Sequence, residues 1–160
     1  MAIFKIVPYQ PHYQEVFARL NRAWLEKYFW VEPLDEQVLG DPDTHILAPG
    51  GAILVALENQ LPIGVVALKY SGDAVFEMTK MAVEEAHQGK GYGKLLCQAA
   101  INKALEMKAD RLILYSNTSL KTAIGIYKNL GWIEIPQTEK LYARSDIKME
   151  YPLKKAGMPL

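Results

Sequence analysis

Apolar side chains recur along the chain with two periods, and each period predicts a different kind of element. Residues 2–7 form a short apolar run that stops at a proline, which predicts a strand. Residues 13–28 carry apolar side chains three and four positions apart, as an amphipathic helix does, and a short helix is expected around residues 35–39. Residues 52–57 and 63–70 are strand-like, and the short polar turn between them predicts an antiparallel hairpin.

A third strand-like run covers residues 75–83. Regular alternation places Glu77, Thr79, Met81 and Val83 on one face of this strand, and Phe76, Met78, Lys80 and Ala82 on the other. Further along, helices are expected over residues 94–108 and 120–130, with a strand over 111–116 between them and closing strands over 132–135 and 148–153. Gly131 is the expected C-cap of the last helix.

The order of these segments favours an α/β fold with a mixed sheet, in which early hairpins are antiparallel and a later strand–helix–strand unit supplies a parallel crossover. No internal repeat and no linker-like stretch interrupts the 160 residues. We therefore expect one domain over residues 1–160, a length that falls in the usual single-domain range.

Composition narrows the class of protein. The 18 Lys and Arg residues balance the 18 Asp and Glu residues, which argues against general nucleic-acid binding. The single cysteine, Cys97, excludes a disulfide framework within the chain, and His12, His45 and His87 share no metal-ligand spacing, so no metal is expected. No stretch reaches the roughly 18 apolar residues that a membrane span needs, and Pro8 interrupts any signal-peptide core. The sequence predicts a cytoplasmic protein without a membrane segment.

A glycine-dense turn joins the third strand to the next helix. It consists of Gln88, Gly89, Lys90, Gly91, Tyr92, Gly93 and Lys94. Glycines let the backbone approach an anion closely, and a helix N-terminus offers free N–H groups, so this turn is a candidate phosphate site. A Walker A loop fails because Gln88 stands where it needs glycine, and a dinucleotide fingerprint fails because Lys94 stands where it needs Gly or Ala.

This turn resembles the Q/R-x-x-G-x-G/A motif of the GNAT superfamily of acyl-CoA N-acyltransferases. A second signature of that family is similar to a later set of residues, namely Asn117, Ala123, Tyr127, Gly131 and Trp132. The resemblance covers about residues 52–132 well and the flanks in outline. It implies the GNAT fold: a central, mostly antiparallel twisted sheet, splayed between its middle strands and flanked by helices. Residues 142–150 resemble the closing segment of a bacterial branch whose domains also occur fused to MarR-type regulators.

The resemblance implies acetyl-CoA as co-substrate. Its pyrophosphate would lie on the backbone N–H groups of residues 88–94. Its pantetheine arm would pair with Met81, Ala82 and Val83, and would accept a hydrogen bond from Asn117. Ala123, the small residue of the second signature, belongs to the same site. By position, the Met81 N–H would stabilise the oxyanion of a tetrahedral intermediate.

Two side chains are candidates for the proton transfers. Tyr127 matches the family's general acid, although a packed core aromatic is the alternative. Glu77, eleven residues before Gln88 as in the protein-lysine-acetylating branch, is the candidate base, directly or through water. Shielding in an apolar strand would raise its pKa, as a base requires. The alternative for Glu77 is a carboxylate paired with a lysine such as Lys80 or Lys69.

The expected function is transfer of an acetyl group to a primary amine of a small or amino-acid-like molecule in a ternary complex. Tyr28 and Trp30 are candidate acceptor contacts, and Arg144 is a candidate clamp for a substrate carboxylate or else a surface ion pair. A protein lysine or N-terminal acetyltransferase and a non-catalytic acyl-CoA sensor are the alternatives. The resemblance also leaves a homodimer open.

Overall fold

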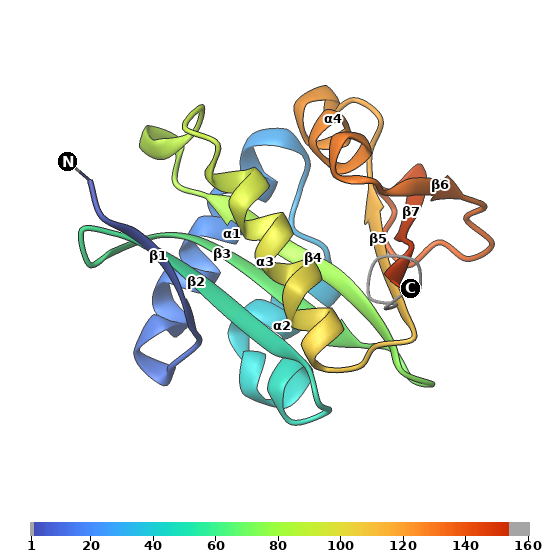
Figure 1. The fold of residues 1–160 in the computed structure, drawn as a ribbon, viewed down its shortest axis with the longest axis horizontal. Coiled ribbons are helices and arrows are strands. Elements are labelled where there is room, and N and C mark those ends of the chain that lie inside the picture. Colours follow the sequence, from blue (N-terminus) through green and yellow to red (C-terminus); the bar gives the residue numbers. More distant parts are fainter. Residues whose placement is uncertain (1, 154–160) are drawn as a thin grey trace, which may run out of the picture.

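A seven-stranded sheet forms the centre of the molecule (Figure 1), whose structure, a computed structural model, describes residues 2–153. In spatial order the strands are β1 (Phe4–Pro8), β2 (Ala52–Glu58), β3 (Leu61–Tyr70), β4 (Val75–Val83), β5 (Arg111–Ser116), β7 (Ile147–Tyr151) and β6 (Ile133–Ile135). The four helices of eight or more residues within this described range are α1 (Gln14–Tyr28), α2 (Pro33–Gly40), α3 (Tyr92–Glu106) and α4 (Lys121–Leu130). All neighbouring strands are antiparallel except β4 and β5.

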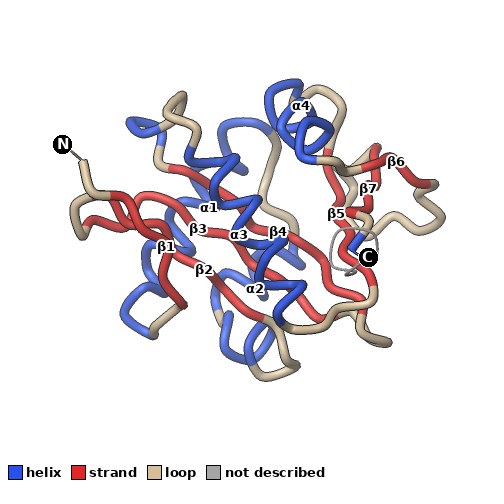
Figure 2. The backbone as a smooth tube through the Cα atoms, viewed as in Figure 1, coloured by secondary structure: helices blue, strands red, loops and turns tan. Residues whose placement is uncertain are grey.

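The sheet separates two apolar cores. On one face, α3 and α4 pack against β2–β5 and β7, with Leu96, Ile101 and Leu112 almost fully buried between them. On the other face, α1 and α2 enclose a second core that includes Phe17 and Leu39. Figures 1 and 2 show α3 crossing one face of the sheet while α1 and α2 lie behind it.

These elements confirm the α/β fold expected from the sequence. The β2–β3 hairpin is antiparallel, and β4–α3–β5 is the parallel crossover. Gly131 ends α4 with φ 110°, as a C-cap glycine should. Boundaries differ by about two residues: α3 begins at Tyr92 because the turn before it is shorter than expected, and a π-helical turn, Asp43–Leu47, was not expected at all. Within residues 2–153, no helix has the length and apolar character to span a bilayer.

The parallel pairing of β4 with β5 is short. It joins Val75–Glu77 to Arg111–Ile113 and then stops, although β4 continues to Val83 and β5 to Ser116. Figure 2 shows the two strands separating from this point. The middle of the sheet is therefore open at one end, as the resemblance implied.

A β-bulge in β4 overturns one expectation. Ala67 pairs with Thr79 but Val65 pairs with Ala82, so Val66 faces two residues, Lys80 and Met81. Lys80 has φ 55°, a left-handed conformation that costs a side chain other than glycine about 1–2 kcal/mol. The expected alternation of faces is wrong beyond Thr79, because the extra residue shifts the pattern by one.

The side chains after the bulge show this shift. Met81 and Val83 pack on the same core as Phe76 and Met78, whereas Ala82 belongs to the core on the opposite face. Glu77 and Met81 therefore do not share a face. The bulge also turns Lys80 away from the α3 core, toward α2.

Candidate active site

Two connected cavities occupy the opening between β4 and β5. The larger, about 700 Å³, lies between the end of β4, the glycine turn and the start of α4. The smaller, about 90 Å³, lies between β4, β5, α1 and the segment that precedes β7. Both are lined by Trp24, Met81, Leu120 and Ala123, so they meet at the bulge of β4.

The glycine turn forms one wall of the larger cavity. Gly89 and Gly91 have φ 82° and 84°, values that side chains with a Cβ rarely adopt. The first hydrogen bond of α3 is donated by Leu95 N–H to Gly91 O, and no side chain caps the helix. The N–H groups of residues 92–94 therefore have no acceptor within the helix, and they lie at its positive end. This wall therefore presents hydrogen-bond donors and the positive end of a helix dipole to the cavity.

Glu58 supports the turn from behind. Its carboxylate accepts a hydrogen bond of 2.8 Å from the Tyr92 hydroxyl, lies 3.0 Å from His87 Nε2, and lies 3.6 Å from Lys90 Nζ. Lys90 therefore points away from the cavity. Of the residues predicted to hold the co-substrate, ten line the larger cavity: Met81, Ala82, Val83, Gln88, Gly89, Gly91, Tyr92, Gly93, Lys94 and Ala123.

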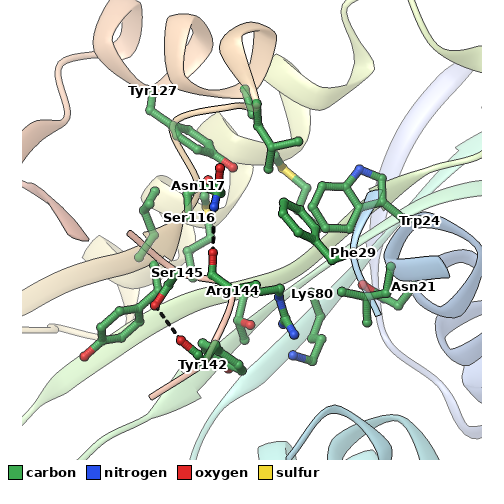
Figure 3. A pocket seen from close by; sticks show the side chains of 18 residues that line it. Asn21, Trp24, Phe29, Lys80, Ser116, Asn117, Tyr127, Tyr142, Arg144 and Ser145 are labelled. Carbon is green, nitrogen blue, oxygen red and sulfur yellow. Dashed lines mark hydrogen bonds between the residues drawn. The ribbon is translucent and has the colours of Figure 1, made fainter. Parts of the chain in front are cut away.

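The smaller cavity is built from side chains of α1, β4, β5, α4 and the segment before β7, together with neighbouring loop residues (Figure 3). Its aromatic lining is Trp24, Phe29, Tyr115, Tyr127 and Tyr142. Its polar lining is Asn21, Thr79, Lys80, Ser116, Asn117, Arg144 and Ser145. In the part of the chain that the structure describes, no Asp or Glu side chain lines this cavity.

Tyr127, the candidate general acid, belongs to α4. It projects from α4 into the smaller cavity, and Figure 3 shows it reaching toward Asn117. Burial raises the pKa of its hydroxyl, so the phenol stays protonated at neutral pH. The Tyr127 ring also packs against the Trp132 ring, as the packed-core alternative predicted. Tyr127 therefore belongs to the apolar core and lines the cavity as well.

Glu77 is placed differently from the expectation. It is 2% exposed and lines neither cavity. Tyr142, which does line the smaller cavity, donates its hydroxyl hydrogen to Glu77 Oε2 over 3.1 Å. Burial raises the pKa of the Glu77 carboxyl, and Lys80, Lys69 and Tyr142 offset only part of that effect.

A buried ionic cluster forms one side of the smaller cavity. Its members are Glu32, Asp35, Lys80 and Arg144. Lys80 Nζ lies 2.7 Å from Asp35 Oδ1, and the Arg144 guanidinium donates to both oxygens of Asp35 over 2.7 and 2.9 Å. Burial opposes ionisation of Asp35, but the hydrogen bonds from Arg144 and the charge of Lys80 prevail and lower its pKa to about 2. Asp35 is therefore ionised throughout the physiological range.

Two predicted ligand contacts are already engaged within the protein. Asn117 donates to the Arg144 carbonyl over 2.7 Å and accepts from the Ser119 N–H over 2.8 Å, and it lines the smaller cavity only. Arg144 lines the same cavity, but both its terminal nitrogens bind Asp35, and one also binds Glu32. The face of the guanidinium that would clamp a substrate carboxylate thus holds a carboxylate of the protein.

The early aromatic residues divide between the cavities. Tyr28 lines the larger one, and Trp30 is 52% exposed and lines neither. Trp24 lines both cavities, and Phe29 lines the smaller one. Sequence reasoning also missed Lys80 and Tyr142. The helical pattern of α1 could have revealed Trp24, but nothing local to Lys80 indicates the bulge that turns it toward Asp35.

The chain thus folds as an α/β sheet that opens beside a glycine-lined helix N-terminus. A family model described as "Acetyltransferase (GNAT) family" matches residues 7–132. The chain belongs to this family.

Curated relatives share segments of the chain. An uncharacterized N-acetyltransferase of Dictyostelium discoideum is 40% identical over 60 residues, or 38% of this chain and 28% of the relative. The uncharacterized N-acetyltransferase YjgM of Escherichia coli K12 is 36% identical over 72 residues, or 45% of this chain and 43% of the relative. The chain thus spans less than half the length of the curated relatives it matches.

Solved structures share the fold over nearly the whole chain. A GNAT-family acetyltransferase of Staphylococcus aureus Mu50 superimposes with a TM-score of 0.84 at 21% identity, covering 95% of this chain and 100% of the other. The acetyltransferase yncA of Salmonella typhimurium, solved with acetyl-CoA, superimposes with a TM-score of 0.73 at 20% identity, covering 99% and 98%.

Proposed function

We propose that the protein transfers the acetyl group of acetyl-CoA to a primary amine by direct attack in a ternary complex. The observation that carries this proposal is the junction of the two cavities at Met81. One cavity suits an extended anionic molecule, the other a small polar one, and their meeting point is where a group could pass between them. Holding both reactants in this geometry supplies much of the acceleration.

The larger cavity has the chemistry that acetyl-CoA needs. The free N–H groups at the start of α3 would bind the pyrophosphate, with Lys94 adding charge at the same wall. The unpaired edge of β4 at residues 81–83 would accept the pantetheine amides as an added strand. The structure of yncA with acetyl-CoA supports this choice of co-substrate. The thioester supplies the activated acetyl group.

The smaller cavity would bind the amine and handle its protons. The amine nitrogen forms a bond to the thioester carbon, and the carbonyl oxygen gains negative charge, which the Met81 N–H stabilises. Collapse of this intermediate breaks the C–S bond, and Tyr127 donates a proton to the thiolate sulfur. The proton lost by the amine passes to the Tyr142 oxygen while the Tyr142 hydroxyl proton moves to Glu77. This route follows from the 3.1 Å hydrogen bond between the two side chains.

The acceptor is a small or amino-acid-like amine. A cationic polyamine would favour carboxylates in the wall, whereas Lys80 and Arg144 are the charged groups that line this cavity among residues 2–153. A spermidine N-acetyltransferase chimera shares the fold at 16% identity, a level that supports the fold and not the substrate. The cavity volume of about 90 Å³ also favours a compact acceptor.

The test is release of CoA thiol from acetyl-CoA, followed with a colourimetric thiol reagent, against amino acids, their amides, polyamines, aminoglycosides and lysine peptides. We expect acceptor-dependent release with amino-acid-like amines that falls at least about 10²-fold in Tyr127→Phe. Tyr70→Phe, a change outside both cavities, is the control. Release only with lysine peptides would favour a protein acetyltransferase. Binding of acetyl-CoA without any release would favour a sensor, and absence of binding would contradict the proposal.

A further inference from the structure

Lys80 combines two properties that rarely occur together. Its backbone lies in the left-handed region in the middle of a sheet, at φ 55°, and its side chain is only 3% exposed. Lysine has no local hydrogen bond that favours this conformation, unlike Asn or Asp. Something outside the strand must therefore hold the residue there.

A strand without the bulge would place the Lys80 side chain unfavourably. Without the extra residue, strict alternation would place Lys80 on the face of Phe76 and Met78, inside the apolar core under α3. An ammonium group there would have no partner, and its burial would be costly. With the bulge, the same ammonium meets Asp35 on the other face of the sheet. The bulged register thus gives the Lys80 ammonium a partner that the unbulged register would not.

The Asp35 carboxylate that binds this ammonium is held in place by other contacts. Its Oδ2 accepts the Glu32 N–H over 2.8 Å, which fixes the carboxylate at the start of α2, and the Arg144 guanidinium binds both of its oxygens. Asp35 is fully buried, so its position follows from these contacts and not from solvent. Three segments far apart in the chain therefore converge on one carboxylate.

We propose that Asp35 is a positioning residue that, by binding Lys80, holds the β4 bulge and thereby aims the backbone of Met81 at the junction of the two cavities. This inference rests on the proposed function, in which the Met81 N–H faces the thioester carbonyl. Lys80 then serves the reaction through its backbone conformation and not by binding the acceptor. A lysine that acts through its backbone conformation should tolerate substitution by glycine, whereas a lysine that binds the acceptor should not.

The test uses glycine as a substitute that adopts a positive φ without cost. Lys80→Gly should keep kcat within about fivefold of wild type, because the bulge no longer needs the ion pair. Lys80→Met should lower kcat about 10²-fold, since an apolar side chain favours the unbulged register in the α3 core. The dissociation constant of CoA should change less than about threefold in Lys80→Gly. In Lys80→Met it should rise, because the change of register also reorients residues 81–83, which would pair with the pantetheine arm. Lys5→Gly, on edge strand β1, controls for the general effect of glycine in a strand.

Asp35 is tested both in the wild-type chain and in the Lys80→Gly variant. Asp35→Asn alone should lower kcat about 10²-fold, but combined with Lys80→Gly it should add only about a fivefold loss, because the double variant has no lysine to hold. Backbone chemical shifts of residues 80 and 81, measured by NMR, report the register without any turnover. They should show the left-handed conformation in wild type and Lys80→Gly, and an extended one in Lys80→Met.

The outcomes separate this inference from the proposed function. If Lys80→Gly loses as much kcat as Lys80→Met, the ammonium itself serves the reaction and the inference is overturned. If Lys80→Met keeps the left-handed shifts, the ion pair does not hold the bulge and the inference is overturned as well. If wild type releases no CoA with any acceptor, the proposed function fails, and the NMR comparison still decides whether Asp35 and Lys80 hold the bulge.

Discussion

The larger and the smaller cavity share four lining residues but differ in what forms their walls. The larger is shaped by backbone: two left-handed glycines, a helix N-terminus and an unpaired strand edge. The smaller is shaped by side chains that come from α1, β4, β5, α4 and the segment before β7. The charged groups at its side reach each other across up to 112 residues of sequence, the separation between Glu32 and Arg144.

This difference predicts which property of the protein a substitution in each cavity should change. A backbone-built site has few side chains to remove, so only a residue that alters the path of the chain should disturb it. A side-chain-built site is also part of the hydrophobic and ionic core, so changes there should alter the stability of the fold together with its chemistry. Each prediction below tests one side of this comparison.

The largest effect should come from the ionic cluster. Arg144→Met removes the main partner of Glu32 and of the fully buried Asp35, and we expect the free energy of unfolding to fall by about 3 kcal/mol. Urea denaturation measures this loss. Arg111→Met, which removes an exposed ion pair with Glu150, is the matched control and should cost less than about 1 kcal/mol. Equal losses in the two variants would remove the distinction between cluster and surface.

Substitution in the glycine turn should weaken binding of the co-substrate. Gly91→Val forces a β-branched residue into φ 84°, and we expect acetyl-CoA to bind about 10²-fold more weakly because the N–H groups at the start of α3 are displaced. Lys90→Ala should change binding less than about threefold, since Lys90 turns toward Glu58. Titration calorimetry compares the two. A larger loss with Lys90→Ala would mean that a side chain, and not the backbone, makes this site.

Acidification should weaken the cluster in a defined window. The pKa of Asp35 in the fold is about 2, against 3.8 for the free side chain, so its ionisation stabilises the protein fully above about pH 4. That contribution, about 2 kcal/mol, is lost as the pH falls from about 4 to about 2. Thermal unfolding from about pH 2 to about pH 6 should show a decline in Tm that is absent in Asp35→Asn. A parallel decline in both proteins would assign it to other groups.

The smallest effect should have the opposite sign. Burial raises the pKa of Glu77, so Glu77 stabilises the fold only at low pH, and its contribution is lost as the pH rises through the raised value. Glu77→Gln should therefore increase stability at about pH 8 by about 1 kcal/mol, with a smaller gain at about pH 5. We expect kcat to fall at least about tenfold in the same variant. Unchanged kcat would exclude Glu77 as the final proton acceptor.

The same contrast explains what the sequence could predict. The glycine turn is local: strand, glycines and helix follow one another along a short stretch of chain, so the wall of the larger cavity could be predicted from sequence alone. The opening of the sheet between its middle strands followed from the resemblance, whereas the strand order was not predicted. Tyr127 was found because it belongs to a spaced signature.

The smaller cavity could not be predicted in the same way. Lys80 is an ordinary strand residue until the bulge turns it, and the bulge depends on Asp35, 45 residues earlier in the chain. Tyr142 covers Glu77 from 65 residues away. These contacts are decided by tertiary packing, and single-sequence periodicity carries no record of them.

The short pairing of β4 with β5 also has a consequence for partial unfolding of the molecule. Only three residue pairs join β1–β4 to β5, β7 and β6 through the sheet, so the second group of strands is a natural unit of partial unfolding. Amide hydrogens of β7 should then exchange through openings that leave β2 and β3 intact. A pantetheine chain lying against the edge of β4 would fill the gap between the units. The co-substrate would therefore couple the partial unfolding of the two units. Amide hydrogens would then exchange more slowly even in strands that the co-substrate does not contact.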